Sequence, residues 1–406
     1  MKVSLLLMVC FVVRAQDISE RPWIVGGQGW GGQERVPWSG SEHWTGGRGG
    51  RASACGPPCV CVLQSERMLL VDCSMAQATA DVVQSFASSP PPSLANKNAT
   101  VRLVVMSSEL PGLDDDSFGN VSFTHVHIKY NHGLDHVAPD AFSASRSTLR
   151  VLDLRNNNLT TFPLANLRSF EQLQFLSVDD NGVSEVPDRV SELASLVHLS
   201  ASNNRLHTLH PSALTSLPLL QFLDLHSNHL DYLPHQLAFL PALRSLIVWG
   251  NPITTLSPGS FRGMRSLEYV DLSYTNIKEV GVSSMETPTS SPWFISFRRT
   301  PITKLSEAAF HNGSLPSWVD LRETGVQSLN QAFFQPLLHN MAQQNIVHND
   351  WGKPQLWIHN EDLACDCSIK WLVTNTTLLH HVSGRCNDKN INVRFLDPDY
   401  FNIFCF

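Results

Sequence analysis

The sequence has little charge and few features of a catalytic or nucleic-acid-binding chain. Only 16% of its 406 residues are charged, and the net charge of -7 leaves no basic surplus for a nucleic-acid backbone. There is no G-x-S-x-G, H-E-x-x-H or phosphate-loop motif, so we expect no enzyme, no catalytic residue and no cofactor. No stretch approaches the roughly 20 apolar residues that a membrane-spanning helix needs. The hydrophobic content of 42% nevertheless suffices for a folded core.

Cysteine is absent from the long middle part of the chain. Cys10 lies in the apolar start, and the other eight form one group of four near each end: Cys55, Cys59, Cys61 and Cys73, then Cys365, Cys367, Cys386 and Cys405. In an exported chain, even groups of this kind are expected to be disulfides. The sequence allows three pairings within each group.

The first residues have the pattern of a secretory signal peptide. Lys2 precedes an apolar run from Val3 to Val13, and Ala15 stands at the cleavage position. We predict that residues 1–15 are removed and that the protein is secreted and extracellular, with neither a membrane span nor a GPI anchor. Residues 16–54 are rich in Gly, Trp, Arg and Ser without a helical or strand period, which predicts a disordered linker.

Between the cysteine groups the chain repeats itself. Five segments fit L-x-x-L-x-L-x-x-N-x-L at a spacing of about 23 to 24 residues: LRVLDLRNNNL (149–159), LQFLSVDDNGV (173–183), LVHLSASNNRL (196–206), LQFLDLHSNHL (220–230) and LRSLIVWGNPI (243–253). Weaker copies have an apolar residue at the second leucine position: Leu103, Val126, Val270, Ile295, Val319 and a half-repeat at 356–363. The chain is therefore predicted to contain about ten repeats.

The repeat has a physical basis. Its x-L-x-L-x core alternates with the period of a β-strand, so the leucines point inward and the residues between them point outward. The asparagine at the ninth position is expected to bond backbone groups of the turn. One repeat cannot bury its own apolar face, so repeats must stack and the two end repeats need caps. The pattern predicts an α/β solenoid, a leucine-rich-repeat horseshoe with a parallel β-sheet on its concave face.

The two cysteine groups resemble the caps of extracellular leucine-rich-repeat proteins. CGPPCVC followed by DCS (55–74) is similar to their N-terminal cap, and LACDCSIKWLV with two later cysteines (363–405) is similar to their C-terminal cap. The resemblance implies an N-terminal cap at 55–98, repeats at 99–360 and a C-terminal cap at 361–406. It also implies the disulfides: Cys55 with Cys61, Cys59 with Cys73, Cys365 with Cys386, and Cys367 with Cys405.

A zinc site at Cys365-x-Cys367 is the alternative to this disulfide cap. Paired zinc ligands usually have two residues between them, and this pair has two distant cysteine partners in an exported chain. His125-x-His127 would point to one face of a strand but has no third ligand. We therefore expect no metal site.

The caps also carry a narrower resemblance. Pro58-Cys59-Val60-Cys61, Asp72-Cys73-Ser74 and a pattern running from Trp371 to Phe401 are similar to arthropod secreted proteins described as non-catalytic subunits of oplophorus-luciferin 2-monooxygenase. This resemblance implies a secreted binding scaffold that accompanies a separate catalytic chain.

Outward-facing strand residues would line the concave face. The residue before each second leucine is often aromatic, and two tryptophans and several arginines lie at neighbouring outward positions. These side chains predict a partner-binding surface formed by Phe175, Phe222, Trp249, Tyr269, Phe294, Arg298, Trp318, Arg322 and Trp357. The alternative is that the rings pack on one another and only stabilise the sheet.

Five Asn-x-Ser/Thr sequons predict N-linked glycans in a secreted protein. They begin at Asn98, Asn120, Asn158, Asn312 and Asn375. Glycosylated faces are poor candidates for tight interfaces.

Three functions are compatible with these features. The first is a secreted recognition protein that binds a protein or glycan on its concave face. The second is a non-catalytic accessory subunit of a secreted oxidoreductase, as in a luciferase-like complex. The third is a structural component of the extracellular matrix.

Overall fold

The computed structural model describes residues 52–53, 55–65, 67–88, 99–163, 169–387 and 391–405, all within the compact unit Arg48–Phe406. The predicted signal peptide, nearly all of the predicted linker and the Asn98 sequon position lie outside the described residues. Among the described helices, none has the length and apolar character needed to cross a membrane.

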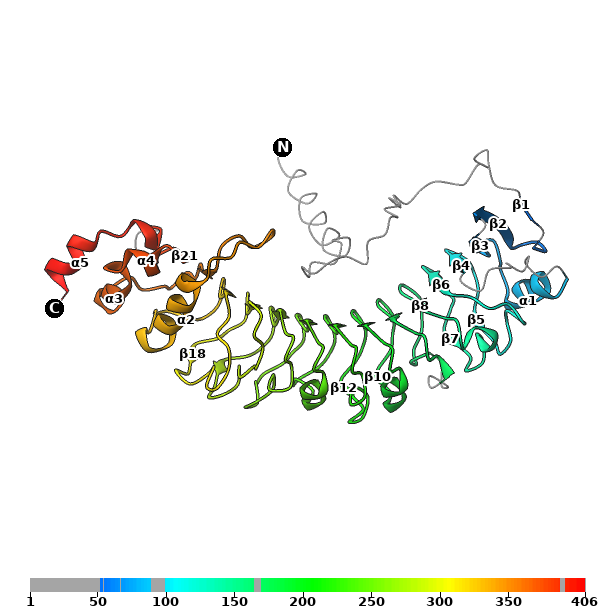
Figure 1. Ribbon diagram of the computed structural model, residues 1–406, viewed down its shortest axis with the longest axis horizontal. Helices are drawn as coiled ribbons and strands as arrows, with labels where there is room; N and C mark the ends of the chain where they lie inside the picture. Colours follow the sequence, from blue (N-terminus) through cyan, green and yellow to red (C-terminus); the bar gives the residue numbers. More distant parts are fainter. Residues whose placement is uncertain are drawn as a thin grey trace, which may run out of the picture. The chain divides into compact units, whose positions relative to one another are not determined.

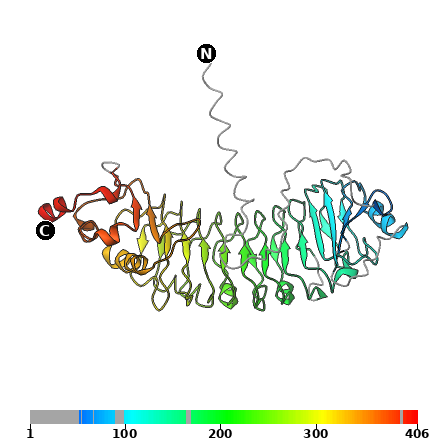
Figure 2. The ribbon, with the colours of Figure 1, turned by 45° about the horizontal axis from the view of Figure 1, so that its top comes forward.

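One sheet of fifteen strands runs through this unit, with the strands side by side in chain order (Figures 1 and 2). β1 with β2 and β2 with β3 are antiparallel, and from β3 onward neighbouring strands are parallel. The strands are β1 (Ala52–Ser53), β2 (Val60–Ser65), β3 (Met68–Asp72), β4 (Thr100–Met106), β6 (His125–Lys129), β8 (Val151–Asp153), β9 (Phe175–Ser177), β11 (His198–Ser200), β13 (Phe222–Asp224), β14 (Ser245–Ile247), β15 (Tyr269–Asp271), β17 (Phe294–Ser296), β19 (Trp318–Asp320), β20 (Gln355–Ile358) and β21 (Val382–Gly384). The predicted solenoid with a parallel sheet is confirmed, and each predicted repeat contributes one strand from β4 to β20.

Between the sheet strands the chain returns through turns, short strands and short helices, which Figure 1 shows on the side of the coil away from the sheet. The short strands pair with one another: β5 (Gly112–Leu113) with β7 (His136–Val137), β10 (Glu185–Val186) with β12 (Thr208–Leu209), and β16 (Glu279–Val280) with β18 (Lys304–Leu305). The α-helices are α1 (Thr79–Ser88), α2 (Gln331–Gln343), α3 (Lys370–Val373), α4 (Thr376–Leu379) and α5 (Pro398–Phe404). The 3-10 helices are η1 (Ser143–Ser145), η3 (Asp188–Glu192), η4 (His235–Phe239), η5 (Cys367–Ile369) and η6 (Val393–Phe395).

The inward leucines form one continuous core from cap to cap. Leu152, Leu199 and Leu223 are fully buried at the second leucine position, and Val186 and Leu209 join the same core from the return segments. Each such side chain gains roughly 1.5 to 3 kcal/mol from burial, and only because the next repeat covers it. This dependence on neighbours explains why the repeats stack.

The repeat asparagines bond the turn backbone as expected. Asn204 donates from Nδ2 to the carbonyls of Val178 and Ser202, and its Oδ1 accepts the N–H of Val183. The other members make equivalent bonds: Asn157, Asn181, Asn228 and Asn251. Asn131, in a repeat that departs from the consensus, extends this ladder toward the N-terminal cap.

The later repeats carry threonine at this position and make fewer bonds. Thr275 donates its hydroxyl to the carbonyl of Leu272, and Thr324 donates to Leu321. Thr300 also reaches Leu272. A hydroxyl supplies one donor where the amide supplies two, so the turn is held less completely there.

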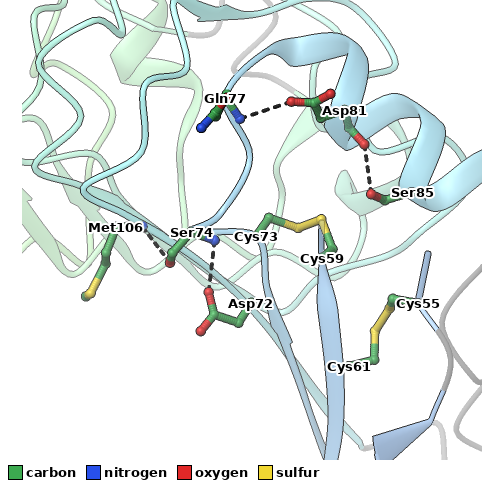
Figure 3. Close-up of a disulfide and its surroundings, with 10 residues drawn as sticks. All are labelled: Cys55, Cys59, Cys61, Asp72, Cys73, Ser74, Gln77, Asp81, Ser85 and Met106. Carbon is green, nitrogen blue, oxygen red and sulfur yellow. Dashed lines mark hydrogen bonds between the residues drawn. A yellow bond between two sulfur atoms is a disulfide. The ribbon is translucent and has the colours of Figure 1, made fainter. Parts of the chain in front are cut away.

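The N-terminal cap continues the sheet and is tied to the first repeat. Disulfides join Cys55 to Cys61 on β2, and Cys59 just before β2 to Cys73 just after β3 (Figure 3). Ser74 links the cap to β4, because its Oγ accepts the N–H of Met106 at 2.9 Å.

Two residues at the end of the predicted linker belong to the sheet. Ala52–Ser53 form β1 and pair with Val62 and Cys61 of β2. The outer edge of β2 would otherwise present unpaired backbone groups, which explains why the preceding chain adds a strand there.

The C-terminal cap covers the last repeat with short helices. Disulfides join Cys365 to Cys386 and Cys367 to Cys405. Ile369, Leu372 and Leu378 are buried against the end of the core. Together with the N-terminal pair, these bonds confirm the predicted disulfide-bonded ends.

Candidate binding surface on the concave sheet

The register of the sheet places the predicted outward residues in one row. Each is the Cα partner of the next across the parallel strands. We call this the first row: Arg102, His125, Val151, Phe175, His198, Phe222, Ser245, Tyr269, Phe294, Trp318 and Gln355. The sequence spacing predicted this alignment, because one residue per repeat at a fixed offset must share a face and a register.

Three rings in the first row stack on one another. His198 lies between Phe175 and Phe222, with ring centroids 4.4 Å apart on both sides and interplanar angles of 3° and 11°. Phe175 and Phe222 remain half-buried, whereas His198 is only 8% exposed. Burial, with a smaller effect of the Arg155 charge, lowers the pKa of His198 to about 3, so the imidazole is neutral at physiological pH.

A second group of rings in the first row is covered by a loop. Trp351 stacks on Tyr269 at 5.8 Å and on Phe294 at 4.8 Å, and lies 5.3 Å from Trp318. The indole Nε1 of Trp318 donates to the carbonyl of Lys353 at 3.0 Å. Phe294 and Trp318 are consequently buried, with 7% and 2% exposed. The expectation that these two rings are displayed to a partner is therefore wrong.

The covering loop, residues 344–354, arises from an unusually long repeat. Trp318 and Gln355 are paired across adjacent strands but are separated by 37 positions in the sequence, well beyond the usual repeat. The extra residues form α2 and a tight turn in which His348 and Gly352 exchange backbone hydrogen bonds at 2.8 and 2.9 Å. His348 also stacks on Trp351 at 3.9 Å. The long spacing was visible in the sequence, but no periodic pattern indicated that the insertion folds over the sheet.

Replacing Trp351 by alanine is expected to uncover Phe294 and Trp318. The loss of ring contacts should lower the free energy of unfolding by about 2 kcal/mol and increase binding of an apolar dye to the native protein. Urea unfolding and native-state dye fluorescence would measure the two effects. Val347→Ala, at a 69% exposed position of the same loop, is the matched control and should change neither. Dye binding equal to that of the parent protein would contradict the covering role of Trp351.

A further set of rings lies beyond the strand ends. His226 stacks on Trp249 at 4.3 Å, and Trp249 lies 6.2 Å from Tyr274 at an angle of 55°. Trp249 is half-buried and Tyr274 is 47% exposed. Burial opposes protonation of His226, but its 2.7 Å contact with Asp224 and that carboxylate's charge outweigh it and raise the pKa of His226.

The predicted arginines are engaged in ion pairs within the chain. Arg322 donates to Asp320 from Nε at 2.8 Å and from Nη2 at 2.5 Å. Arg298 donates to Glu323 from Nη2 at 2.7 Å. Because of these ion pairs, the positive charge available to a partner near β17 and β19 is smaller than the sequence predicted. Trp357 is half-buried, 6.1 Å from Phe294.

Carboxylates at the next outward position were not predicted. Asp153, Asp224, Asp271 and Asp320 stand two residues after first-row residues, on the same face of their strands. Asp153 contacts the Lys129 Nζ at 2.6 Å and the Arg155 Nε at 2.9 Å. Aspartate recurs two residues after the first row in several repeats. This second outward position could have been predicted from the sequence as a row of carboxylates.

The described part of the chain contains no group of three or more His, Cys, Asp or Glu side chains able to hold a metal ion. His125 and His127 both lie on the outer face of β6, and His127 is 3.6 Å from the Asp153 carboxylate. The surface is a pattern of rings and ion pairs along a sheet.

The sequon asparagines within the described residues lie away from the first row. Asn120, Asn158 and Asn312 are exposed. Asn375 is the N-cap residue of α4, where its Oδ1 accepts the N–H of Leu378 at 3.2 Å. Their use as glycan attachment sites stays a prediction.

The stacked repeats, the parallel sheet and the end disulfides define a leucine-rich-repeat fold. The family model described as leucine rich repeat matches residues 121–183, 171–230 and 241–286.

Comparison with curated proteins adds a more particular relationship. The chain is similar to the oplophorus-luciferin 2-monooxygenase non-catalytic subunit of Oplophorus gracilirostris, with 27% identity over 141 residues. The match spans 34% of this chain and 38% of that relative.

Among solved structures, the chain is similar to a chain of the octameric complex of Latrophilin 3, Unc5D and FLRT2, in which FLRT2 contributes its leucine-rich repeats. That match has 20% identity and a TM-score of 0.60, covering 85% of this chain and 99% of the other. A chain from the Drosophila Toll–Spatzle complex matches with 20% identity and a TM-score of 0.47, over 75% of this chain and 42% of the other. These likenesses concern the fold.

Proposed function

We propose that this chain is a secreted, non-catalytic binding protein that holds a protein partner against the concave sheet between β9 and β15. The observation that carries the proposal is the set of partly exposed rings on this part of the face, Phe175, Phe222 and Trp249, outside the stretch covered by residues 344–354. Aromatic side chains on an exposed sheet face are typical anchors of protein interfaces. Four disulfides support an oxidising, extracellular location.

The stacking geometry favours a protein over a glycan. A sugar ring usually packs on the open face of an aromatic ring. Here His198 takes one face each of Phe175 and Phe222, and His226 takes one face of Trp249. The edges of these rings and the Asp224 carboxylate instead present the mixed apolar and charged surface that suits a protein.

Replacing Phe222 and Trp249 together by alanine is expected to weaken partner binding by at least about tenfold, because hot-spot aromatics contribute roughly 2 kcal/mol or more each. A crosslinking pull-down from native fluid, quantified by mass spectrometry, would measure the recovered partner. Tyr232→Ala is the matched control, because Tyr232 is also a large, 46% exposed side chain but belongs to a return segment. Equal recovery by the double variant and the parent protein would refute the proposal.

A second candidate is an accessory subunit of a secreted oxidoreductase. It is favoured by the similarity to the Oplophorus non-catalytic subunit, which by its name accompanies a catalytic chain. In the same pull-down, stoichiometric recovery of an oxidoreductase would support this function. Recovery of a receptor or another non-enzyme would support the general binding role instead.

A further inference from the structure

Four cationic residues lie on three neighbouring strands, or directly beside them, near the N-terminal cap. Arg102 lies on β4, Lys129 on β6, and Arg150 and Arg155 lie just before and just after β8. The Asp153 carboxylate is shared by Lys129 and Arg155. Neither Arg102 nor Arg150 has an ion-pair partner in the described ranges of the chain, and the buried Nε of Arg102 has no hydrogen-bond acceptor there.

The two histidines of β6 respond to this positive charge. Burial, together with the smaller effects of the charges of Arg102, His127 and Arg150, lowers the pKa of His125 to about 4. Burial also lowers the pKa of His127; the hydrogen bond and the charge of Asp153 oppose this shift, and the charges of Lys129 and Arg102 add to it. The arginines are thus close enough to oppose another positive charge, and an anion at the same place would be stabilised.

Nearby acids offset only part of this positive charge. Asp72, on the adjacent strand β3, accepts the N–H of its near neighbour Ser74 at 2.9 Å. Asp153 already has two cationic partners, and Asp179 of the next repeat acts on Arg155, so these carboxylates leave Arg102 and Arg150 without an ion pair in the described ranges. In a chain whose net charge is -7, this patch is a local reversal of sign. A partly buried guanidinium without an acceptor favours a ligand that supplies one.

The length of the patch limits the ligand. β4, β6 and β8 are consecutive strands, so the cations extend over about 10 Å at roughly 4.8 Å per strand spacing. The following repeat carries Asp179 and Asp180 just beyond the end of β9. A long polyanion that continued along the sheet would be repelled by these carboxylates, whereas one or two adjacent carboxylates of a peptide would not reach them.

We propose that the surface formed by β4, β6 and β8 binds a short acidic segment of a protein partner, with Arg102 and Arg150 as the groups that bind its carboxylates. Phe175 follows directly in the first row, so an apolar residue beside the acidic one would meet the ring stack. This inference rests on the proposed function, since it specifies the chemistry of one end of the partner on the same face.

The test uses a randomised octapeptide display library selected on the immobilised full chain. Peptides enriched in Asp and Glu are expected. A resynthesised peptide should bind about tenfold more weakly to Arg150→Gln than to the parent protein. The double variant Arg102→Gln/Arg150→Gln should bind it at least about tenfold more weakly than Arg150→Gln does. The affinity of the parent protein should fall as the salt concentration rises. Arg205→Gln is the matched control, because Arg205 is exposed on another repeat. Arg150 is also exposed, so its single variant keeps the test valid if loss of the partly buried Arg102 affects folding.

Several results would overturn the inference: no selected peptides, selected peptides without acidic enrichment, or equal binding by the parent protein and Arg150→Gln. Tighter binding of a heparin dodecasaccharide than of the peptides, lost in the double variant, would identify a polyanion site instead. Apolar peptides that lose binding in Phe222→Ala/Trp249→Ala, without acidic enrichment, would sustain the proposed function and reject only this inference.

Discussion

Replacing Asn228 by alanine is expected to lower the free energy of unfolding by about 4 kcal/mol. Its Nδ2 donates to the carbonyls of Ala201, Leu225 and His226 at 2.9, 3.0 and 3.2 Å, and its Oδ1 accepts the N–H of Leu206 at 3.0 Å. The side chain is 3% exposed, so truncation leaves the Ala201 carbonyl and the Leu206 N–H unpaired away from water, whereas the carbonyls of Leu225 and His226 keep donors from Asn251 and Asn203. Each unpaired group costs roughly 1 to 3 kcal/mol.

Urea unfolding followed by circular dichroism would measure this loss. The slope of the transition should be recorded as well, because a solenoid weakened at one repeat can lose cooperativity. His229→Ala is the matched control, since His229 is the next residue and is exposed; its effect should stay within about 0.5 kcal/mol. Asn228→Thr, which imitates the later repeats, should fall between the two. A loss below about 1 kcal/mol for Asn228→Ala would contradict the role of the asparagine ladder.

The ladder could be predicted because it depends on local sequence alone. A strand of period 2 fixes which side chains point inward, and a polar residue at a constant offset must meet the same turn in every repeat. Asn131 escaped prediction because its repeat has Val126 and Ile128 where the consensus has leucine. Its bonds to Ser108 and Val105 show that the turn survives this substitution.

The accessibility of the first row could not be predicted in the same way. Phe294 and Trp318 stand at the outward offset just as Phe175 and Phe222 do, yet only the first pair is buried. The difference is made by Trp351, which belongs to residues outside the repeat pattern. Whether an insertion covers a sheet or projects from it depends on tertiary contacts such as the stacking of Trp351 on Phe294, which leave no periodic signal.

Ion pairing was missed for a related reason. Arg322 was predicted as a binding residue from its outward position, but the outward Asp320 two residues earlier neutralises it. Conversely, the proximity of Arg102 and Arg150 was not predicted, because the two residues are almost fifty positions apart in the sequence. Strand stacking places both beside His125.

Acid is expected to destabilise the protein through buried neutral histidines, and His198→Phe should remove much of this effect. His198 in the folded protein has its pKa lowered to about 3, chiefly by burial, whereas an unfolded histidine titrates near 6.5. Between these values the unfolded chain binds a proton that the folded chain does not, so the free energy of unfolding falls as the pH drops from about 6.5 toward 3. At pH 4 the neutral His198 lowers the free energy of unfolding of the parent protein by about 3 kcal/mol compared with pH 7. The loss of unfolding free energy between pH 7 and pH 4 should therefore be smaller by that amount in His198→Phe.

Phenylalanine suits this position because the imidazole already lies in a ring stack between Phe175 and Phe222. Urea unfolding at pH 7, 5.5 and 4 would measure the change, with His311→Phe, at an exposed site, as the control for loss of a histidine.

Some acid sensitivity should remain in His198→Phe. His125 has its pKa lowered to about 4, chiefly by burial, and so acts in the same direction as His198. The pKa of Asp153 is also depressed: burial raises it, but His127, Arg155 and Lys129 together outweigh burial, so its stabilising contribution is present above the unfolded pKa and is lost in acid. An unchanged loss of stability between pH 7 and pH 4 in His198→Phe would show that this imidazole is protonated in the folded protein, and the ring stack would then have to accommodate a cation.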